Sequence, residues 1–216
     1  MPSVGGASRT NQKIRTRTAI VDACRDLIRT GRDVSIPEVA RLALVSEATV
    51  YRYFPDLVSL VNEAIVGLWP SPAEALEPVA RSTDPIERIA FASEVFLRRV
   101  FAYQGAVRAM IAATITRPGG PATRPGFRFA WIDEALTPAQ ATRAPEAAET
   151  FARLKRDLSV VVSAEALFTL TDLCGLSPDE AIMSAARLAA TITAAALCAG
   201  APQLTTDVSD GQRRVS

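Results

Sequence analysis

The chain of 216 residues contains no histidine and only three cysteines. Histidine is the commonest general base and the commonest metal ligand, so its absence removes the usual arrangements for acid–base catalysis and zinc binding. Cys24, Cys174 and Cys198 are too far apart for a metal knuckle, and we interpret them as small core residues in a reducing compartment. Without a Gly-rich phosphate loop or a paired nucleophile and base, the sequence predicts no enzyme, no catalytic residues, no metal site and no cofactor.

Long uncharged runs are also scarce. No apolar run follows the N-terminus, so no signal peptide is expected. The longest uncharged stretch is residues 188–206, and its apolar part, about 188–199, is too short to span a bilayer. The sequence therefore predicts a soluble, cytoplasmic protein that has no membrane partner.

The charges are nearly balanced, with a net charge of +1, but they are unevenly distributed. Residues 1–60 carry nine Lys/Arg against six Asp/Glu, whereas residues 61–216 carry fifteen against seventeen. Four basic residues precede the first acidic one: Arg9, Lys13, Arg15 and Arg17. A basic N-terminal module on a slightly acidic body suits contact with phosphates, although four charges alone would equally fit a solvated helix start.

Apolar residues recur at helical spacing along the chain, and no stretch alternates with the period of a strand for long. The predicted fold is all-α, with a loose tail at 1–8 and a break at 70–83. We expect a helix-turn-helix domain at 1–60, a larger helical domain at 61–200 and a flexible tail at 201–216. The expected helices are 9–30, two short ones within 35–54, then 56–69, 84–103, 106–116, 127–136, 145–173 and 177–198.

Residues 35–54 have the features of two short helices joined by a tight turn. Ser35 is a suitable N-cap, and Glu38 three residues later predicts a capping box. Ser46 marks the second helix start, where Val50 and Phe54 would face inward. Two such helices form a helix-turn-helix whose second helix can enter a DNA major groove.

The segments 43–46 (ALVS) and 49–54 (TVYRYF) resemble the recognition-helix signature of the TetR family of transcriptional regulators. The helices expected before and after the motif complete that family's N-terminal module, so the resemblance covers about the first third of the chain. Two positions depart from the family pattern. Leu44 occupies the turn position usually held by Gly, and Leu57 occupies the position of a usual Lys that contacts phosphate.

The resemblance implies that Glu47, Thr49 and Arg52 reach base edges, while Tyr51 and Tyr53 donate hydroxyls to phosphates. Chemically, Arg52 can form a bidentate contact with guanine, and the Thr49 methyl can touch thymine. The alternative is a plain helical hairpin with both tyrosines in a core. The full predicted DNA-binding set is Lys13, Arg17, Ser35, Ser46, Glu47, Thr49, Tyr51, Arg52 and Tyr53.

Aromatic side chains concentrate in the middle of the chain, where the TetR resemblance implies a pocket for a regulatory small molecule. The candidate pocket residues are Phe96, Tyr103, Met110, Phe127, Trp131, Glu165 and Phe168. Glu165 is unusual because it interrupts an apolar stripe, and an unpaired carboxylate there is costly. It would recognise a cationic or hydrogen-bond-donating effector, form an internal salt bridge with Arg98, Arg99 or Arg108, or simply be exposed on the far side of a bent helix. For any single aromatic residue, an ordinary hydrophobic core is the favoured explanation.

The last predicted helix has a broad apolar face of small residues, which allow close helix packing. In the TetR family the last two long helices pair across a twofold axis, so the resemblance implies a homodimer. The predicted interface residues are Ile182, Ala185, Ala189, Ile192 and Ala196.

These features together predict a homodimeric, ligand-responsive transcriptional regulator, with repression favoured. Its partners would be a palindromic double-stranded DNA operator, an unidentified small-molecule effector and a second copy of itself. The alternative is a dimeric small-molecule-binding protein whose DNA-binding module is weakened at Leu44 and Leu57.

Overall fold

The computed structural model describes residues 5–66, 68–115, 126–141 and 147–198. Within these ranges the regular elements are all helical, which confirms the predicted fold class. The elements are α1 (Gly5–Arg29), α2 (Ile36–Leu42), α3 (Glu47–Tyr53), α4 (Leu57–Ile65), α5 (Pro72–Ala75), the 3-10 turn η1 (Glu77–Val79), α6 (Pro85–Ala102), α7 (Gln104–Ile115), α8 (Phe127–Ala141), α9 (Ala148–Val161), α10 (Ala164–Phe168), the π-helical turn η3 (Thr169–Leu173) and α11 (Pro178–Cys198).

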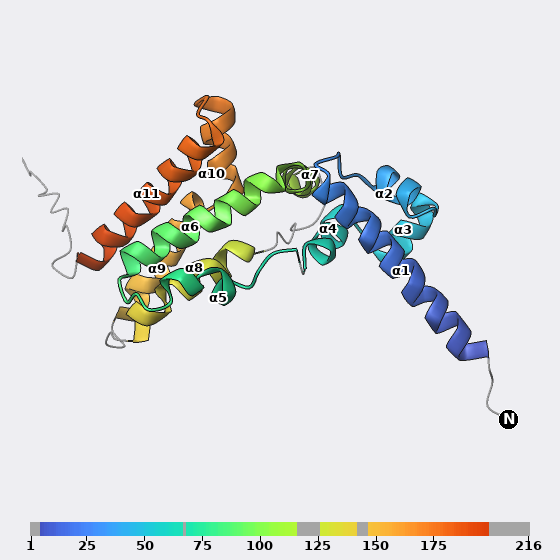
Figure 1. Cartoon of the computed structure of the whole chain (residues 1–216), viewed down its shortest axis with the longest axis horizontal. Helices are drawn as coiled ribbons and strands as arrows, with labels where there is room; N and C mark the ends of the chain where they lie inside the picture. Colours follow the sequence, from blue (N-terminus) through green and yellow to red (C-terminus); the bar gives the residue numbers. More distant parts are fainter. Residues whose placement is uncertain (1–4, 67, 116–125, 142–146, 199–216) are drawn as a thin grey trace, which may run out of the picture.

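Helices α1 to α3 lie at one end of the molecule and α6, α8, α9 and α11 at the other, with α4 and α7 between them (Figure 1). Two hydrophobic clusters follow this division. The first cluster joins buried residues of α1 to α4 to Ala106 and Met110 of α7. The second cluster is built mainly from α6 and from α8 to α11. The first cluster continues past residue 60, because the α4 residues Val61, Ala64 and Ile65 belong to it.

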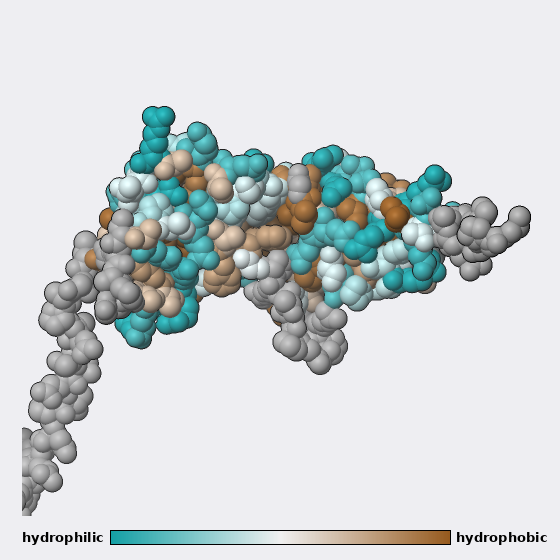
Figure 2. Space-filling view, turned by 90° about the horizontal axis from the view of Figure 1, so that it is seen from below, coloured by the Kyte–Doolittle hydropathy of each residue, from teal (hydrophilic) through white to brown (hydrophobic). Residues whose placement is uncertain are grey.

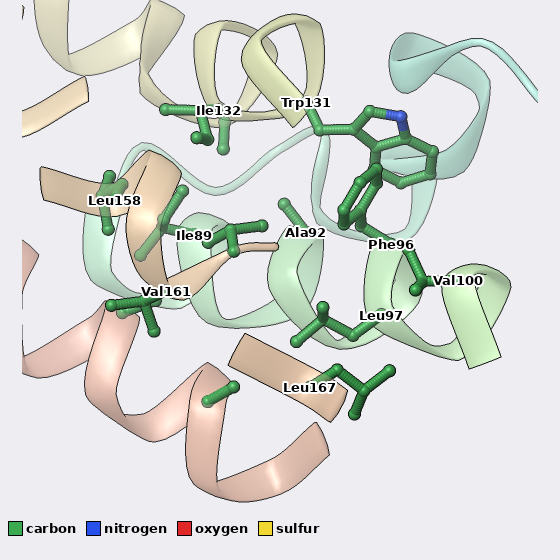
Figure 3. Packing of buried hydrophobic residues seen from close by; sticks show 14 of the residues in the cluster. Ile89, Ala92, Phe96, Leu97, Val100, Trp131, Ile132, Leu158, Val161 and Leu167 are labelled. Carbon is green, nitrogen blue, oxygen red and sulfur yellow. The ribbon is translucent and has the colours of Figure 1, made fainter. Parts of the chain in front are cut away.

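The second cluster is centred on α6 (Figure 3). Ile89 and Leu97 of α6 are fully buried, and Leu158 of α9 and Leu167 of α10 pack into the same cluster. Ile132 of α8 completes the layer shown. Because α6 contacts α8, α10 and α11, it fixes the positions of the helices around it.

Most predicted helix starts are correct because local caps define them. The Asp84 carboxylate accepts from the Ile86 amide at 2.8 Å, and α6 begins at the following proline as expected. Ser177 and Glu180 bond reciprocally at the start of α11.

Several boundaries differ from the predictions. Residues 5–8 belong to α1 instead of a tail, and Gly105 lies within α7. The expected long helix from 145 to 173 is broken after α9, because Ser163 caps a new helix by accepting from the Ala166 amide at 3.0 Å. The predicted end of the expected helix 106–116 lies outside the described residues.

The cysteines do not share one environment. Cys24 is fully buried in the first cluster, and this burial raises the pKa of its thiol to about 12. Cys174 is exposed at the end of η3, so its prediction as a core residue was wrong. The side chain of Cys198 lies outside the described part of the chain.

Helix α8 continues through Pro138 to Ala141, although the sequence predicted that it would end at 136. Pro138 has no amide hydrogen, so the Glu134 carbonyl loses its helical donor. Arg88 of α6, only 3% exposed, supplies the missing bond: its Nη2 donates to the Glu134 carbonyl at 2.9 Å. Its other nitrogens donate to the carbonyls of Ala135 at 3.0 Å and Val79 at 2.8 Å. A buried guanidinium therefore makes the proline tolerable and joins α6, α8 and η1.

Helix α11 is, by length and composition alone, long and apolar enough to cross a membrane over Pro178–Leu197, with 33% of that window buried inside the molecule. This window is longer than the stretch at 188–199 considered from the sequence. The helix packs against α6 and α9 and buries Ile182, Ala185 and Ala189, each at most 2% exposed. These three residues were predicted at a dimer interface, and within the single chain their side chains pack in its own core.

Replacing Arg88 with methionine should destabilise the protein by at least about 3 kcal/mol, because one buried and two partly buried carbonyls would each lose a charged donor. Urea unfolding at one fixed protein concentration measures this change. The matched control is Arg153→Met on α9, where the arginine is exposed and the expected change is within about 0.5 kcal/mol. Equal stability of the two variants would contradict the role given to Arg88.

Candidate nucleic-acid interface and ligand cavity

Helix α2 begins at Ser35, whose hydroxyl accepts from the Glu38 amide at 3.5 Å. The predicted capping box is only half formed. The Glu38 carboxylate pairs instead with Arg41 at 2.9 Å and with Arg32 at 3.1 Å. The hydrogen bond from Arg41 lowers the pKa of Glu38 below its usual value. Ser35 is half-buried and acts here as a helix cap.

The turn between α2 and α3 is a Schellman motif. The Val45 amide bonds to the Ala40 carbonyl at 3.0 Å, and the Leu44 amide bonds to the Arg41 carbonyl at 3.4 Å. Leu44 has a φ of 55° and is 91% exposed. At the end of α1 the same pair of bonds surrounds Gly31, whose φ is 66°. Leu44 thus occupies a position for which glycine is conformationally suited.

Helix α3 is held at both ends. The Ser46 hydroxyl accepts from the Thr49 amide at 3.2 Å and lies 3.0 Å from the Thr49 hydroxyl. Val50 and, just beyond the helix, Phe54 are 0% and 2% exposed, so the predicted inward residues anchor the helix to the first cluster. The opposite face is therefore presented in a fixed orientation.

The outward face of α3 carries Glu47, Tyr51 and Arg52, all exposed. Thr49 and Tyr53 are half-buried, and the Tyr53 ring packs partly against the first cluster with the Arg52 guanidinium 5.5 Å from its centroid. The alternative interpretation required both tyrosines in a core, whereas Tyr51 is 52% exposed. The face offers a guanidinium, a carboxylate and a phenol, which are groups able to contact bases and phosphates.

Lys13 and Arg17, both in the predicted DNA-binding set, are exposed on α1. Arg17 lies in a network: its Nε donates to Glu63 of α4 at 3.0 Å, and its guanidinium lies 4.6 Å from the Phe54 ring centroid. It also donates to the Tyr53 carbonyl at 3.5 Å, at the end of α3. Arg17 thus ties α1 to α3 and α4, a structural role that spacing along α1 did not indicate.

A cavity of about 50 Å³ lies where α4, α6, α7, α8 and α10 meet, and it has room for a few water molecules. Four predicted pocket residues line it, together with Trp69 and Arg128, which the sequence analysis missed. The lining comprises Ile65, Trp69, Phe96, Val100, Val107, Met110, Ile111, Thr114, Phe127, Arg128, Ala164 and Glu165. Figure 2 shows hydrophobic residues reaching the surface near the middle of the molecule, between largely hydrophilic ends.

Three predicted pocket residues do not line this cavity. Tyr103 stacks on Trp69 with centroids 6.3 Å apart, and Trp131 packs on Phe96 with centroids 5.7 Å apart. The Arg108 guanidinium lies over the Phe168 ring, with 3.8 Å between its Cζ atom and the ring centroid. These rings support the cavity wall or the core behind it.

Glu165 lines the cavity and also forms a salt bridge, but with none of the three predicted arginines. Its carboxylate lies 3.1 Å from Nη2 of Arg128, whose Nη1 donates to the Ser159 carbonyl at 2.9 Å. Arg108 pairs instead with Asp172, and that hydrogen bond lowers the pKa of Asp172. Residues 128 and 165 come together because α8 and α10 flank the same cavity, a contact that the sequence does not reveal.

Comparison with solved structures finds a TetR transcriptional regulator from Rhodococcus sp. RHA1. It is 19% identical, the match covers 84% of this chain and 97% of that chain, and the TM-score is 0.53. No protein-family model matches the sequence, and no curated protein matches it. The chain has a TetR-like fold.

The TetR-like fold extends well beyond the first third of the chain that carried the sequence resemblance. Within this fold, residues of α4, α6, α7, α8 and α10 surround one cavity despite their separation in the sequence. Of the residues that sequence reasoning missed, Trp69 had a usable signal: a tryptophan immediately before Pro70, where a helix was expected to end. Arg128 had none, since its importance depends on a partner 37 residues away.

Leu44→Gly should stabilise the protein by about 0.5–1 kcal/mol, because glycine adopts a positive φ without the steric cost borne by leucine. Urea unfolding measures this gain. The matched control is the reciprocal change Gly31→Leu, which should destabilise by a similar amount, since a Cβ at Gly31 meets no atom within 4 Å and only the backbone is affected. The two substitutions must change the free energy of unfolding in opposite directions. A loss of stability in Leu44→Gly would refute the role given to the positive φ.

Proposed function

We propose that the protein is a homodimeric, ligand-responsive DNA-binding regulator of transcription that acts as a cytoplasmic repressor. The observation that carries this proposal is the presentation of Glu47, Tyr51 and Arg52 on the outer face of a capped, core-anchored helix in a TetR-like fold. In a dimer, two such helices would enter successive major grooves of a palindromic site. Arg52 would read guanine, and Tyr51 would contact the backbone.

The proposed response to a ligand uses the position of the cavity. Ile65, the last residue of α4, lines it, and α4 also packs in the first cluster with α1 to α3. A molecule bound there would move the DNA-binding helices if it bound two positions of α4 unequally.

The proposed dimer surface is the exposed side of α9 to α11. A groove of about 390 Å³ on this side is lined by Val160, Val161, Glu165, Ala166, Thr169, Leu170, Ser184, Ala185 and Leu188. Val160 is 70% exposed and Leu188 is 49% exposed, and Met183 of α11 is 47% exposed. The predicted interface residues Ile192 and Ala196 are half-buried on the same helix and remain part of the proposal. Exposed apolar side chains along adjacent helices favour a self-association surface.

A second candidate is a dimeric small-molecule-binding protein with a weakened DNA-binding module. Two observations favour it. Leu44 retains a strained conformation in the turn, and Leu57 at the start of α4 packs against the first cluster and carries no charge for a phosphate. The two candidates differ in whether the purified protein selects a DNA sequence.

Selection of bound DNA from a random pool at moderate salt tests the proposal. We expect enrichment of a palindromic sequence, and Arg52→Ala should bind it about 10- to 100-fold more weakly because a bidentate base contact contributes about 1–3 kcal/mol. The control is Arg153→Ala on α9, at an exposed arginine away from α3, which should bind like the wild type. A folded protein that enriches no sequence would refute the regulator and favour the second candidate.

Sedimentation at micromolar concentration tests the dimer. The wild type should sediment as a dimer, and Leu188→Glu should shift it to monomer because an unpaired carboxylate would be buried in the interface. The control is Ile14→Glu on α1, 58% exposed and distant from α11, which should leave the dimer intact. A monomeric wild type would contradict the proposal, as would an unchanged dimer in Leu188→Glu.

A further inference from the structure

The cavity has a distinctive chemical lining. Among the described residues that line it, the only charged ones are Arg128 and Glu165, and these two pair at 3.1 Å. The Thr114 hydroxyl donates to the Ile111 carbonyl at 2.7 Å. The remaining lining side chains are apolar or aromatic, so the charges are matched within the wall itself.

Trp69 carries a polar group in this lining that is not matched by a partner. Its indole Nε1 is buried and has no hydrogen-bond acceptor among the described residues. A buried donor without an acceptor is unfavourable and therefore uncommon. Trp69 lines the cavity, so a group inside the cavity is the available source of an acceptor.

The indole ring has limited freedom to turn away from this position. It packs edge-on against Phe96 with centroids 5.6 Å apart, stacks on Tyr103 at 6.3 Å and lies tilted against Phe127 at 5.7 Å. Rotating the ring would lose these contacts, which come from α6, from the turn between α6 and α7, and from α8. The donor is thus held in place before any ligand is bound.

We propose that the cavity binds a neutral, mainly apolar small molecule carrying a hydrogen-bond-accepting oxygen, and that the Trp69 indole donates to that oxygen. This inference rests on the proposed ligand response. A cationic ligand would have to draw Glu165 away from Arg128, and an anionic one would have to draw Arg128 away from Glu165. A neutral acceptor leaves that pair intact and satisfies the one unmatched donor. Because the cavity holds only a few waters, its side chains must move apart to admit the molecule.

Four probes of similar size separate these possibilities: acetophenone, ethylbenzene, benzoate and benzylammonium. Calorimetry on the full-length protein should show acetophenone binding about tenfold more tightly than ethylbenzene, since only the ketone accepts a hydrogen bond. Both charged probes should bind more weakly than acetophenone. In a ¹H–¹⁵N spectrum, acetophenone should shift the indole resonance of Trp69 downfield, and ethylbenzene should not.

Trp69→Phe assigns that resonance and keeps a ring while removing the donor. In this variant the preference for acetophenone over ethylbenzene should fall to about onefold. The matched control is Trp131→Phe, which removes a buried indole that does not line the cavity and should preserve the preference. If either variant fails to fold, the wild-type ratio and the indole shift still decide the matter.

Equal affinity for acetophenone and ethylbenzene would overturn the role of the indole donor. Tighter binding of benzoate or benzylammonium would overturn the choice of a neutral ligand. If DNA is enriched but no probe binds, this inference fails while the DNA-binding proposal stands. If acetophenone binds with the expected preference but no DNA is enriched, the inference stands and the regulator proposal fails.

Discussion

The packing of Trp69 joins the two hydrophobic clusters of the molecule. Its ring contacts Phe96 of the second cluster and Tyr103 and Phe127, which pack against the first. Trp69 follows α4 by only a few residues, so displacement of α4 relative to α6 must disturb these ring contacts. Because interiors are close-packed, such a displacement favours a change between discrete arrangements over a gradual deformation.

Features governed by neighbouring residues could be predicted from the sequence. The caps at Ser46, Asp84 and Ser177 are local, so the starts of α3, α6 and α11 were correct. The extension of α8 through Pro138 could not be predicted, because the donor that compensates for the proline comes from Arg88, about fifty residues earlier. A proline normally ends a helix, and only tertiary packing reverses that expectation.

The candidate sites show the same difference between local features, which the sequence predicts, and features that depend on tertiary packing. The outward face of α3 follows from helical periodicity once Val50 and Phe54 are taken as buried. The pairing of Glu165 with Arg128 depends on how α8 meets α10, and the sequence offered three other arginines that were equally plausible. Three of the predicted dimer residues on α11 pack in the chain's own core, which the sequence did not indicate because that helix is apolar on most of its surface. Its composition shows that it is buried extensively but not which face meets α6 and which remains exposed.

The small size of the cavity bears on the direction of the proposed response. At about 50 Å³ it is far smaller than the pockets of several hundred Å³ that hold drug-sized ligands. A drug-sized ligand can bind only a conformation of the protein in which the cavity is expanded. Because it has no comparable affinity for the compact conformation, binding shifts the population towards the expanded one. Ile65 at the end of α4 and Trp69 just after it line the cavity, and expansion on that side displaces α4, which packs against α1. If the compact arrangement is the one that fits DNA, the ligand lowers DNA affinity, which is the behaviour of an inducible repressor.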